Sequence, residues 1–257
     1  MLTLKEIKKN YNDLPGFDKG ILREYLQYKI LDIFYKSNFG QKLSFLGGTA
    51  IRICYGSFRF SEDLDFDVID LTEKDFNDIT VLLEKELKLL GYNIEIKTVH
   101  KGAFHIYIKF LDVLFNNDLS VMRDEKLMIQ IDAVQKNFLY KSEDFLLSKF
   151  DVFRNILIAP KDIVLSKKVG AIFGRKRAKG RDFYDIIYLM SLTDFNYEYL
   201  KEQFGIKDKK GLKKELLSKI KDFNFDQLSR DVAPFLINRD EIERVLSFRE
   251  YIEQVLK

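Results

Sequence analysis

The sequence predicts an α+β fold, with a mixed sheet flanked by helices in the first part of the chain and mostly helices in the second. Three observations support this prediction. Several segments carry apolar residues at helical spacing, alternating apolar and polar residues mark strands in the first part, and the strand pattern fades after about residue 155. We therefore expect two domains, a core with N-terminal helices at 1–155 and a helical domain at 156–257.

The first domain begins with helices and continues with strands. The amphipathic segment 72–90 places Phe76, Ile79 and Leu83 at helical spacing, and Gly91 is a natural stop. Alternation is clearest around Phe104 in the later strands. In order, we expect helices at 3–12 and 18–37, a strand at 43–46, a helix at 49–56, a strand at 63–69, a helix at 72–90, and strands near 92–99, 103–113 and 126–134.

The second domain begins at Pro160, a residue that suits the first turn of a helix. The segment KDIVLSKKVGAIFG follows it and is expected to be helical. Further helices are expected at 181–192, 196–204, 208–221, 224–233 and 239–256.

Composition restricts the kind of protein. The chain has 257 residues, of which 46% are hydrophobic and 32% charged, which is typical of a folded protein. The single cysteine, Cys54, excludes an internal disulfide and a cysteine zinc cluster. No apolar stretch approaches the roughly 20 residues that span a bilayer, and the N-terminus does not resemble a signal peptide. We expect a cytoplasmic protein without a membrane partner.

Acidic and basic residues are distributed unevenly. Residues 1–135 carry a net charge of −3 and residues 136–257 a net charge of +6. The most basic block is 167–181, with seven basic residues and no acid. A basic block apart from an acidic one suits a polyanionic substrate. The candidate residues for contacts with such a substrate, which would be RNA if the family resemblance described below holds, are Arg175, Lys176, Arg177, Lys179 and Arg181.

Three acids alternate with apolar residues in the segment EDLDFDV. Alternation places Asp63, Asp65 and Asp67 on one strand face, where their charges repel. A divalent cation is the usual reason to tolerate that arrangement, and Mg²⁺ binds carboxylates together with nucleotide phosphates. Asp63 and Asp65 are the candidate metal ligands, and Asp67 is ranked below them. The alternative for D-x-D alone is an exposed strand edge.

A third carboxylate lies far along the sequence. Asp132 is in the middle of the apolar strand MIQIDAV, where an isolated charge would cost much free energy to desolvate. A neighbouring strand with Asp63 and Asp65 would let all three bind Mg²⁺ or Mn²⁺. Asp132 would then be best placed to polarise an incoming hydroxyl, while metal neutralises the triphosphate.

Residues around these acids are candidates for nucleotide binding. Gly48 and Thr49 belong to a diglycine-threonine helix start that suits a phosphate. Arg59 and Ser61 precede the acids and could contact phosphate oxygens, or Arg59 could orient an aspartate. A surface ion pair between Arg59 and Glu62 is an equally good interpretation.

Lys168 has apolar neighbours and is a candidate to contact the triphosphate. Asp182 and Asp185 lie three residues apart on the next expected helix. Asp182 could instead simply favour the dipole of that helix.

These motifs resemble the AbiEii/AbiGii toxin family of nucleotidyltransferases, which belongs to the DNA polymerase β-like superfamily. The Gly-Gly-Thr-Ala-Leu-Arg and Arg-x-Ser-x-Asp-Leu-Asp-Phe patterns of the family correspond to 47–52 and 59–66, with Ile51 in the leucine position. A later motif corresponds to 167–171 and 181–186, although Lys167 replaces the usual glutamate and Val169 the leucine.

The resemblance implies a polymerase β-like core and a C-terminal domain that contributes to the active site. It implies that Asp63, Asp65 and Asp132 are metal ligands and that Lys168 and Asp185 belong to the catalytic set. It further implies an NTP substrate, a cognate antitoxin, a role in abortive infection, and transfer of NMP to RNA, which in the best-understood members is the tRNA 3′ end. A protein or small-molecule hydroxyl as acceptor, and a non-catalytic binding module, stay open as alternatives.

Overall fold

The computed structural model describes residues 2–12, 14–100 and 102–256. Its contacts divide the chain into two units, one made of Met1–Gly56 and Phe60–Ala159, the other of Ser57–Arg59 and Pro160–Lys257. This division lies four residues beyond the expected border at 155. It also assigns Ser57–Arg59, which end at the first residue of the motif at 59–66, to the second unit, which the sequence did not predict.

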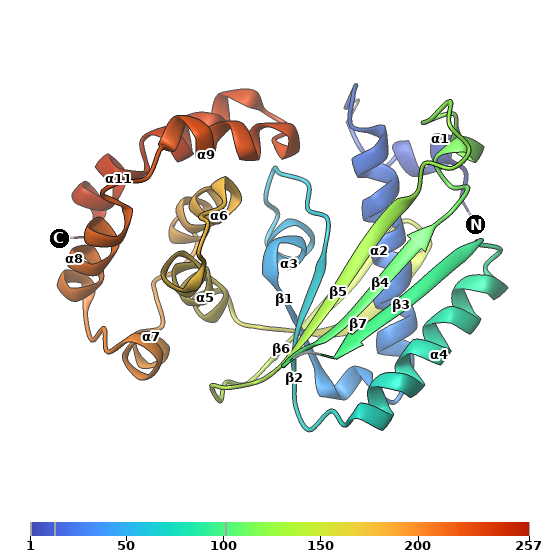
Figure 1. Cartoon of the computed structure of the whole chain (residues 1–257), viewed down its shortest axis with the longest axis horizontal. Helices are drawn as coiled ribbons and strands as arrows, with labels where there is room; N and C mark the ends of the chain where they lie inside the picture. The colour runs from blue at the N-terminus through green and yellow to red at the C-terminus, as the bar shows by residue number, and fades with distance from the viewer. Residues whose placement is uncertain (1, 13, 101, 257) are drawn as a thin grey trace. The chain divides into compact units, whose positions relative to one another are not determined.

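A mixed seven-stranded sheet forms the centre of the first unit, which confirms the predicted α+β class (Figure 1). Its strand order is β3-β4-β5-β2-β1-β7-β6. The pairs β2–β5 and β1–β7 are parallel, and the other neighbouring pairs are antiparallel. The strands are β1 Leu43–Leu46, β2 Leu64–Val68, β3 Ile94–His100, β4 Phe104–Phe110, β5 Leu127–Gln135, β6 Glu143–Lys149 and β7 Val152–Ile158.

Helices pack on the sheet of this unit. The helices are α1 Leu4–Lys8, α2 Asp18–Lys36, α3 Gly47–Ile53 and α4 Glu73–Leu89. Thr72 and Asp75 form a capping box at the start of α4, and Gly91 follows its end with φ of +86°. The expected helix 3–12 is wrong after Lys8. The helix expected at 49–56 instead begins at the diglycine and ends at Ile53.

One face of the sheet is buried and the other is partly open. Alternate residues of β4 and β5, such as Ile106, Ile108 and Ile131, are buried. Helix α2 contacts β5, β7 and α4, and α4 contacts β3, so these two helices cover that buried face (Figure 1). The intervening residues, among them Tyr107 and Asp132, are half-exposed on the opposite face.

A buried charge network anchors α3 to α2. Glu24 of α2 is 3% exposed and accepts hydrogen bonds from Tyr11 Oη (2.8 Å), Arg52 Nε (2.8 Å) and Lys149 Nζ (2.7 Å). Burial alone would raise the pKa of Glu24, but Arg52 and Lys149 outweigh it and lower the pKa below 4.5. The Arg52 guanidinium also lies 4.7 Å from the centre of the Phe60 ring. Arg52, the arginine of the first motif, therefore helps to hold α3 in place through Glu24 and Phe60.

The hairpin β6–β7 was missed by the sequence analysis. Only Leu147 of β6 is fully buried, so this strand carries little alternation. Phe150 in the turn has φ of +59°. Its ring makes edge contacts with Tyr25 and Tyr28 at 5.3 and 5.1 Å between ring centres, and this aromatic packing favours the unusual backbone conformation.

The second unit is helical, as the sequence predicts. Phe183 packs at right angles to Phe225 and Phe248 at 5.4 and 4.8 Å between ring centres, and these rings form its core. The expected helix at 239–256 is wrong in part, because it breaks at Ser247 into two shorter helices. The helices are α5 Lys161–Gly174, α6 Gly180–Met190, α7 Tyr197–Phe204, α8 Lys209–Ile220, α9 Phe225–Val232, α10 Glu243–Leu246 and α11 Phe248–Val255. Across the part of the chain that the structure describes, no helix has the length and apolar character needed to cross a membrane.

Candidate active site

Two of the predicted carboxylates lie side by side on the sheet. The parallel pairing of β2 with β5 places Asp65 directly opposite Asp132. Neighbouring strands are about 4.8 Å apart, and paired residues point to the same face. Both residues are half-exposed, and Asp63 lies just before β2, two residues from Asp65. The topology thus brings Asp65 and Asp132 together although 67 positions separate them in the sequence.

A metal site is not preformed in this arrangement. Among residues 2–12, 14–100 and 102–256, no three His, Cys, Asp or Glu side chains stand close enough together to hold a metal ion. The donor chemistry nevertheless fits Mg²⁺, because this ion is usually held by one or two carboxylates together with substrate phosphates. Metal binding by Asp63, Asp65 and Asp132 stays a prediction.

Asp132 is held by two neighbours that the sequence analysis missed. His105 of β4 lies opposite Asp132 in the antiparallel register, with Nδ1 2.6 Å from Asp132 Oδ1. Gln130 donates from Nε2 to both carboxylate oxygens, at 2.8 and 3.0 Å. These contacts fix the direction of the carboxylate on the open side of the sheet. Only the β4–β5 register could have revealed the histidine partner.

The first glycine of the diglycine makes room for Asp65. Gly47 has φ of +79°, a conformation that favours glycine. A Cβ atom at this position would lie 2.0 Å from Asp65 Oδ2 and 2.6 Å from its Cγ. The start of α3 therefore packs directly against the carboxylate, and this close approach requires glycine.

The other predicted nucleotide-binding residues of this unit are largely buried. Thr49 is fully buried and its hydroxyl donates to the Asp63 carbonyl, which helps to position the segment before β2. Gly48 is buried beside it, and Ser61 is 8% exposed. Gln27 of α2 donates to the Ser61 carbonyl at 3.1 Å. Nucleotide contacts by Gly48, Thr49 and Ser61 stay predictions.

Asp67 is buried and hydrogen-bonded to a tyrosine. This residue is 2% exposed and accepts a hydrogen bond of 2.7 Å from Tyr140 Oη, which also lies 3.2 Å from Ser44 Oγ. The ranking of Asp67 below the other two acids as a metal ligand stays a prediction.

A second charged cluster lies within the second unit. Arg59 is 1% exposed and makes a two-pronged contact with Asp185, from Nε to Oδ1 at 2.6 Å and from Nη2 to Oδ2 at 2.5 Å. Lys168 Nζ lies 2.8 Å from Asp185 Oδ2 and 3.2 Å from Asp182 Oδ1, and Arg175 donates to the other oxygen of Asp182. Burial by itself would raise the pKa of Asp185, but Arg59 and Lys168 lower it below 3.8.

This cluster changes the interpretation of Arg59. The arginine is buried, so the surface ion pair with Glu62 is wrong. The interpretation that it orients an aspartate agrees with the Asp185 contact. Lys168 bridges two buried carboxylates, and its proposed contact with a triphosphate stays a prediction.

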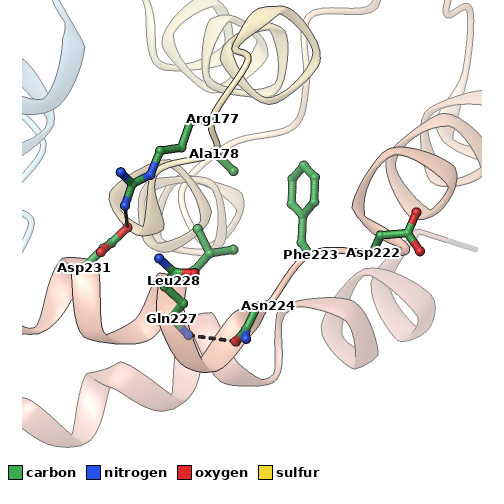
Figure 2. Close-up of a pocket in the computed structure, with 8 residues that line it drawn as sticks. All are labelled: Arg177, Ala178, Asp222, Phe223, Asn224, Gln227, Leu228 and Asp231. Carbon is green, nitrogen blue, oxygen red and sulfur yellow. Dashed lines mark hydrogen bonds and ion pairs between the residues drawn. The ribbon is translucent and has the colours of Figure 1, made fainter.

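The predicted RNA-binding residues lie on or near the loop between α5 and α6. Lys176, Arg177 and Lys179 are exposed, Arg181 is half-exposed, and Arg175 contacts Asp182. Arg177 and Phe223 line an open pocket of about 250 Å³. Figure 2 shows the two side chains on opposite sides of this pocket. Its other lining residues are Ala178, Asp222, Asn224, Gln227, Leu228 and Asp231. Arg177 Nη2 lies 3.9 Å from Asp231 Oδ2. The pocket thus combines basic and acidic groups, so it is less basic than the sequence of the loop alone suggests.

Comparison with known proteins identifies the family. The model described as "Nucleotidyl transferase AbiEii toxin, Type IV TA system" matches residues 29–253. The chain belongs to the AbiEii family. It is therefore a nucleotidyltransferase toxin, as the motifs indicated, and the family model adds that the toxin–antitoxin system is of type IV. The family implies an NTP substrate and an antitoxin partner.

Solved structures show that other proteins share the fold of this AbiEii chain. MenT4, the nucleotidyltransferase toxin Rv2826c from Mycobacterium tuberculosis H37Rv, is 13% identical and superposes with a TM-score of 0.65 over 99% of this chain and 91% of MenT4. JHP933 from Helicobacter pylori is 18% identical, with a TM-score of 0.53 over 95% of both chains. The comparison with curated proteins finds no match.

Proposed function

We propose that this AbiEii protein transfers NMP from an NTP to an RNA acceptor, the 3′ end of tRNA, and that it acts in abortive infection against phage. The observation that carries the proposal is the register pairing of Asp65 with Asp132 on the partly open sheet face, with Asp63 two residues away. Adjacent carboxylates on a rigid sheet suit a reaction in which a nucleotide is held through metal-bridged phosphates.

In this proposal the 3′ hydroxyl of the acceptor attacks the α-phosphorus of the NTP. A bond forms between the hydroxyl oxygen and that phosphorus, the bond to the β-phosphate oxygen breaks, and pyrophosphate leaves. Asp132 accepts the hydroxyl proton, and its contacts with His105 and Gln130 hold it in place. Asp63, Asp65 and Asp132 would hold Mg²⁺ or Mn²⁺, which when bound neutralises charge on the triphosphate and on the leaving pyrophosphate.

The remaining assignments rest on the family motifs. Lys168 and Asp185 complete the catalytic set, with contribution from the C-terminal domain, and Arg59 supports Asp185. Nucleotide contacts are assigned to Gly48, Thr49, Arg59, Ser61 and Lys168, and RNA contacts to Arg175, Lys176, Arg177, Lys179 and Arg181.

Labelled NTPs and total RNA test the proposal directly. We expect one of the four NTPs to label the tRNA fraction in the presence of Mg²⁺, and EDTA to abolish labelling. Asp65→Asn should lower the rate by about 10²–10³-fold, because it removes one of the carboxylates that would hold the metal. Asp78→Asn is the matched control, since Asp78 is exposed on α4.

Two results would count against this function. Absence of labelling with every NTP would oppose nucleotide transfer to RNA, and full activity of Asp65→Asn would oppose the assigned site. Label on protein or on a small molecule instead of RNA would favour the alternative acceptors.

A further inference from the structure

The sheet face that carries Asp132 continues away from the site onto β4 and β3. Register pairs Asp132 with His105, and Gln130 with Tyr107, which in turn pairs with Lys97 on β3. These paired side chains, from Asp132 on β5 to Lys97 on β3, therefore point to the same side of the sheet, and none is fully buried. We call this surface the open sheet face and define it by Lys97, His105, Tyr107, Lys109 and Gln130.

The charge of this surface changes with distance from the carboxylates. Lys97 is exposed, and the side chain of Lys109 is 44% exposed. Lys126 is also exposed, and Glu95 lies 3.9 Å from Lys109 and 3.4 Å from Lys126. Three lysines and one glutamate leave this end basic. A polyanion can thus lie over β3 and β4 with its end directed to Asp132.

The middle of the surface offers rings for stacking. His105 and Tyr107 alternate on β4, and their rings lie 6.5 Å apart at an angle of 28°. Both are half-exposed, so a planar group can reach Tyr107 from solvent. Aromatic rings on a basic surface are how proteins hold unpaired bases, whereas a duplex hides its base faces.

We propose that the open sheet face binds the single-stranded 3′ segment of the acceptor RNA. The terminal hydroxyl lies at Asp132, a preceding base stacks on Tyr107, and backbone phosphates contact Lys97 and Lys109. The proposal deepens the proposed function and rests on it for the chemistry, but the binding can be measured without any reaction.

A fluorescent reporter tests the stacking contact. The chain contains no tryptophan, so Tyr107→Trp introduces a single indole on the open sheet face. Titration with a single-stranded oligoribonucleotide should quench its emission, and a blunt RNA duplex should not. Phe153→Trp is the control, because Phe153 is 71% exposed on β7, away from this surface, and should not be quenched. Equal quenching in both variants, or none in Tyr107→Trp, overturns the proposal.

Affinity and kinetics provide the second measurement. Tyr107→Leu and Lys97→Ser should each weaken binding of the labelled oligonucleotide about five- to tenfold and raise the KM for RNA equally, with the KM for NTP unchanged. Phe153→Leu and Lys85→Ser, both at exposed positions elsewhere on this unit, should change neither value.

The two proposals fail in different ways. If the wild-type protein labels RNA but Tyr107→Leu and Lys97→Ser leave the KM for RNA unchanged, the proposed docking surface alone is overturned. Quenching and weakened binding without any NMP transfer overturns the proposed reaction and leaves the docking surface standing.

Discussion

Replacement of Gly47 by alanine should disturb the carboxylate of Asp65 directly. The new Cβ would lie 2.0 Å from Asp65 Oδ2, whereas such contacts are essentially never below 3.0 Å, so the carboxylate must move by about 1 Å. A displacement of that size at a reacting group can cost about 10²-fold in rate. We expect kcat for NMP transfer to fall by about that factor.

The same substitution should also lower stability. Alanine at φ of +79° costs about 1–2 kcal/mol, and rotation of the Asp65 side chain costs about 1 kcal/mol more. Gly91→Ala separates the two effects, because Gly91 has φ of +86° but nothing lies within 4 Å of the added Cβ. Urea unfolding should show Gly47→Ala to be less stable than Gly91→Ala by about 1 kcal/mol.

A double-mutant cycle with Asp65→Ala completes the test. Asp65→Ala removes the Cγ and Oδ2 atoms that would clash with the new Cβ, so Gly47→Ala should lower the free energy of unfolding by less in that background. Equal costs of Gly47→Ala in the wild-type and Asp65→Ala backgrounds would refute the reasoning, as would unchanged transfer by Gly47→Ala.

Three further substitutions test buried contacts. Arg59→Met should lower the free energy of unfolding in urea by about 3–5 kcal/mol, because it breaks a buried ion pair with Asp185. A loss below about 1 kcal/mol would contradict this. The pKa of Glu24 is lower in the folded protein than in the unfolded chain, so its ion pairs stabilise the fold above pH 4.5, and this stability is lost as the pH falls through the folded-state pKa. Glu24→Gln should therefore make the free energy of unfolding depend less on pH in this acidic range. An unchanged pH dependence would oppose the assignment. Gly180→Ala would place Cβ 1.8 Å from the Leu228 carbonyl oxygen and should cost about 1–3 kcal/mol; unchanged thermal unfolding would contradict the close packing.

Local patterns predicted much of the fold. The strand at 43–46 agrees with β1 in both bounds, and the amphipathic segment 72–90 agrees with α4 to within a residue at each end. These segments carry their own signals, namely an apolar run before a diglycine and a helical repeat with a glycine stop. The strand before Phe150 carries no such signal, because β6 is mostly exposed and depends on pairing with β7 and on ring packing of Phe150 with α2.

For the candidate site, the sequence predicted the carboxylates and their proximity but not the side chains that hold them. Asp65 and Asp132 were expected to be neighbours, and the β2–β5 register now gives that pairing. The His105 contact depends on the β4–β5 register, and the Arg59–Asp185 contact joins residues 126 positions apart. Neither contact follows from local periodicity, because both arise from the tertiary fold.

The segment Ser57–Arg59 has a consequence for how the gene can be divided. These three residues supply the second unit with the guanidinium that neutralises Asp185, and the Ile237 amide donates to the Phe58 carbonyl at 3.0 Å. A fragment that starts at Pro160 would lack both, and its buried Asp185 would lose one of the two cations that lower its pKa and keep Lys168. The segment from Pro160 onward is thus not a self-sufficient module that evolution or an engineer can transplant, because three residues of its unit are encoded about a hundred codons upstream.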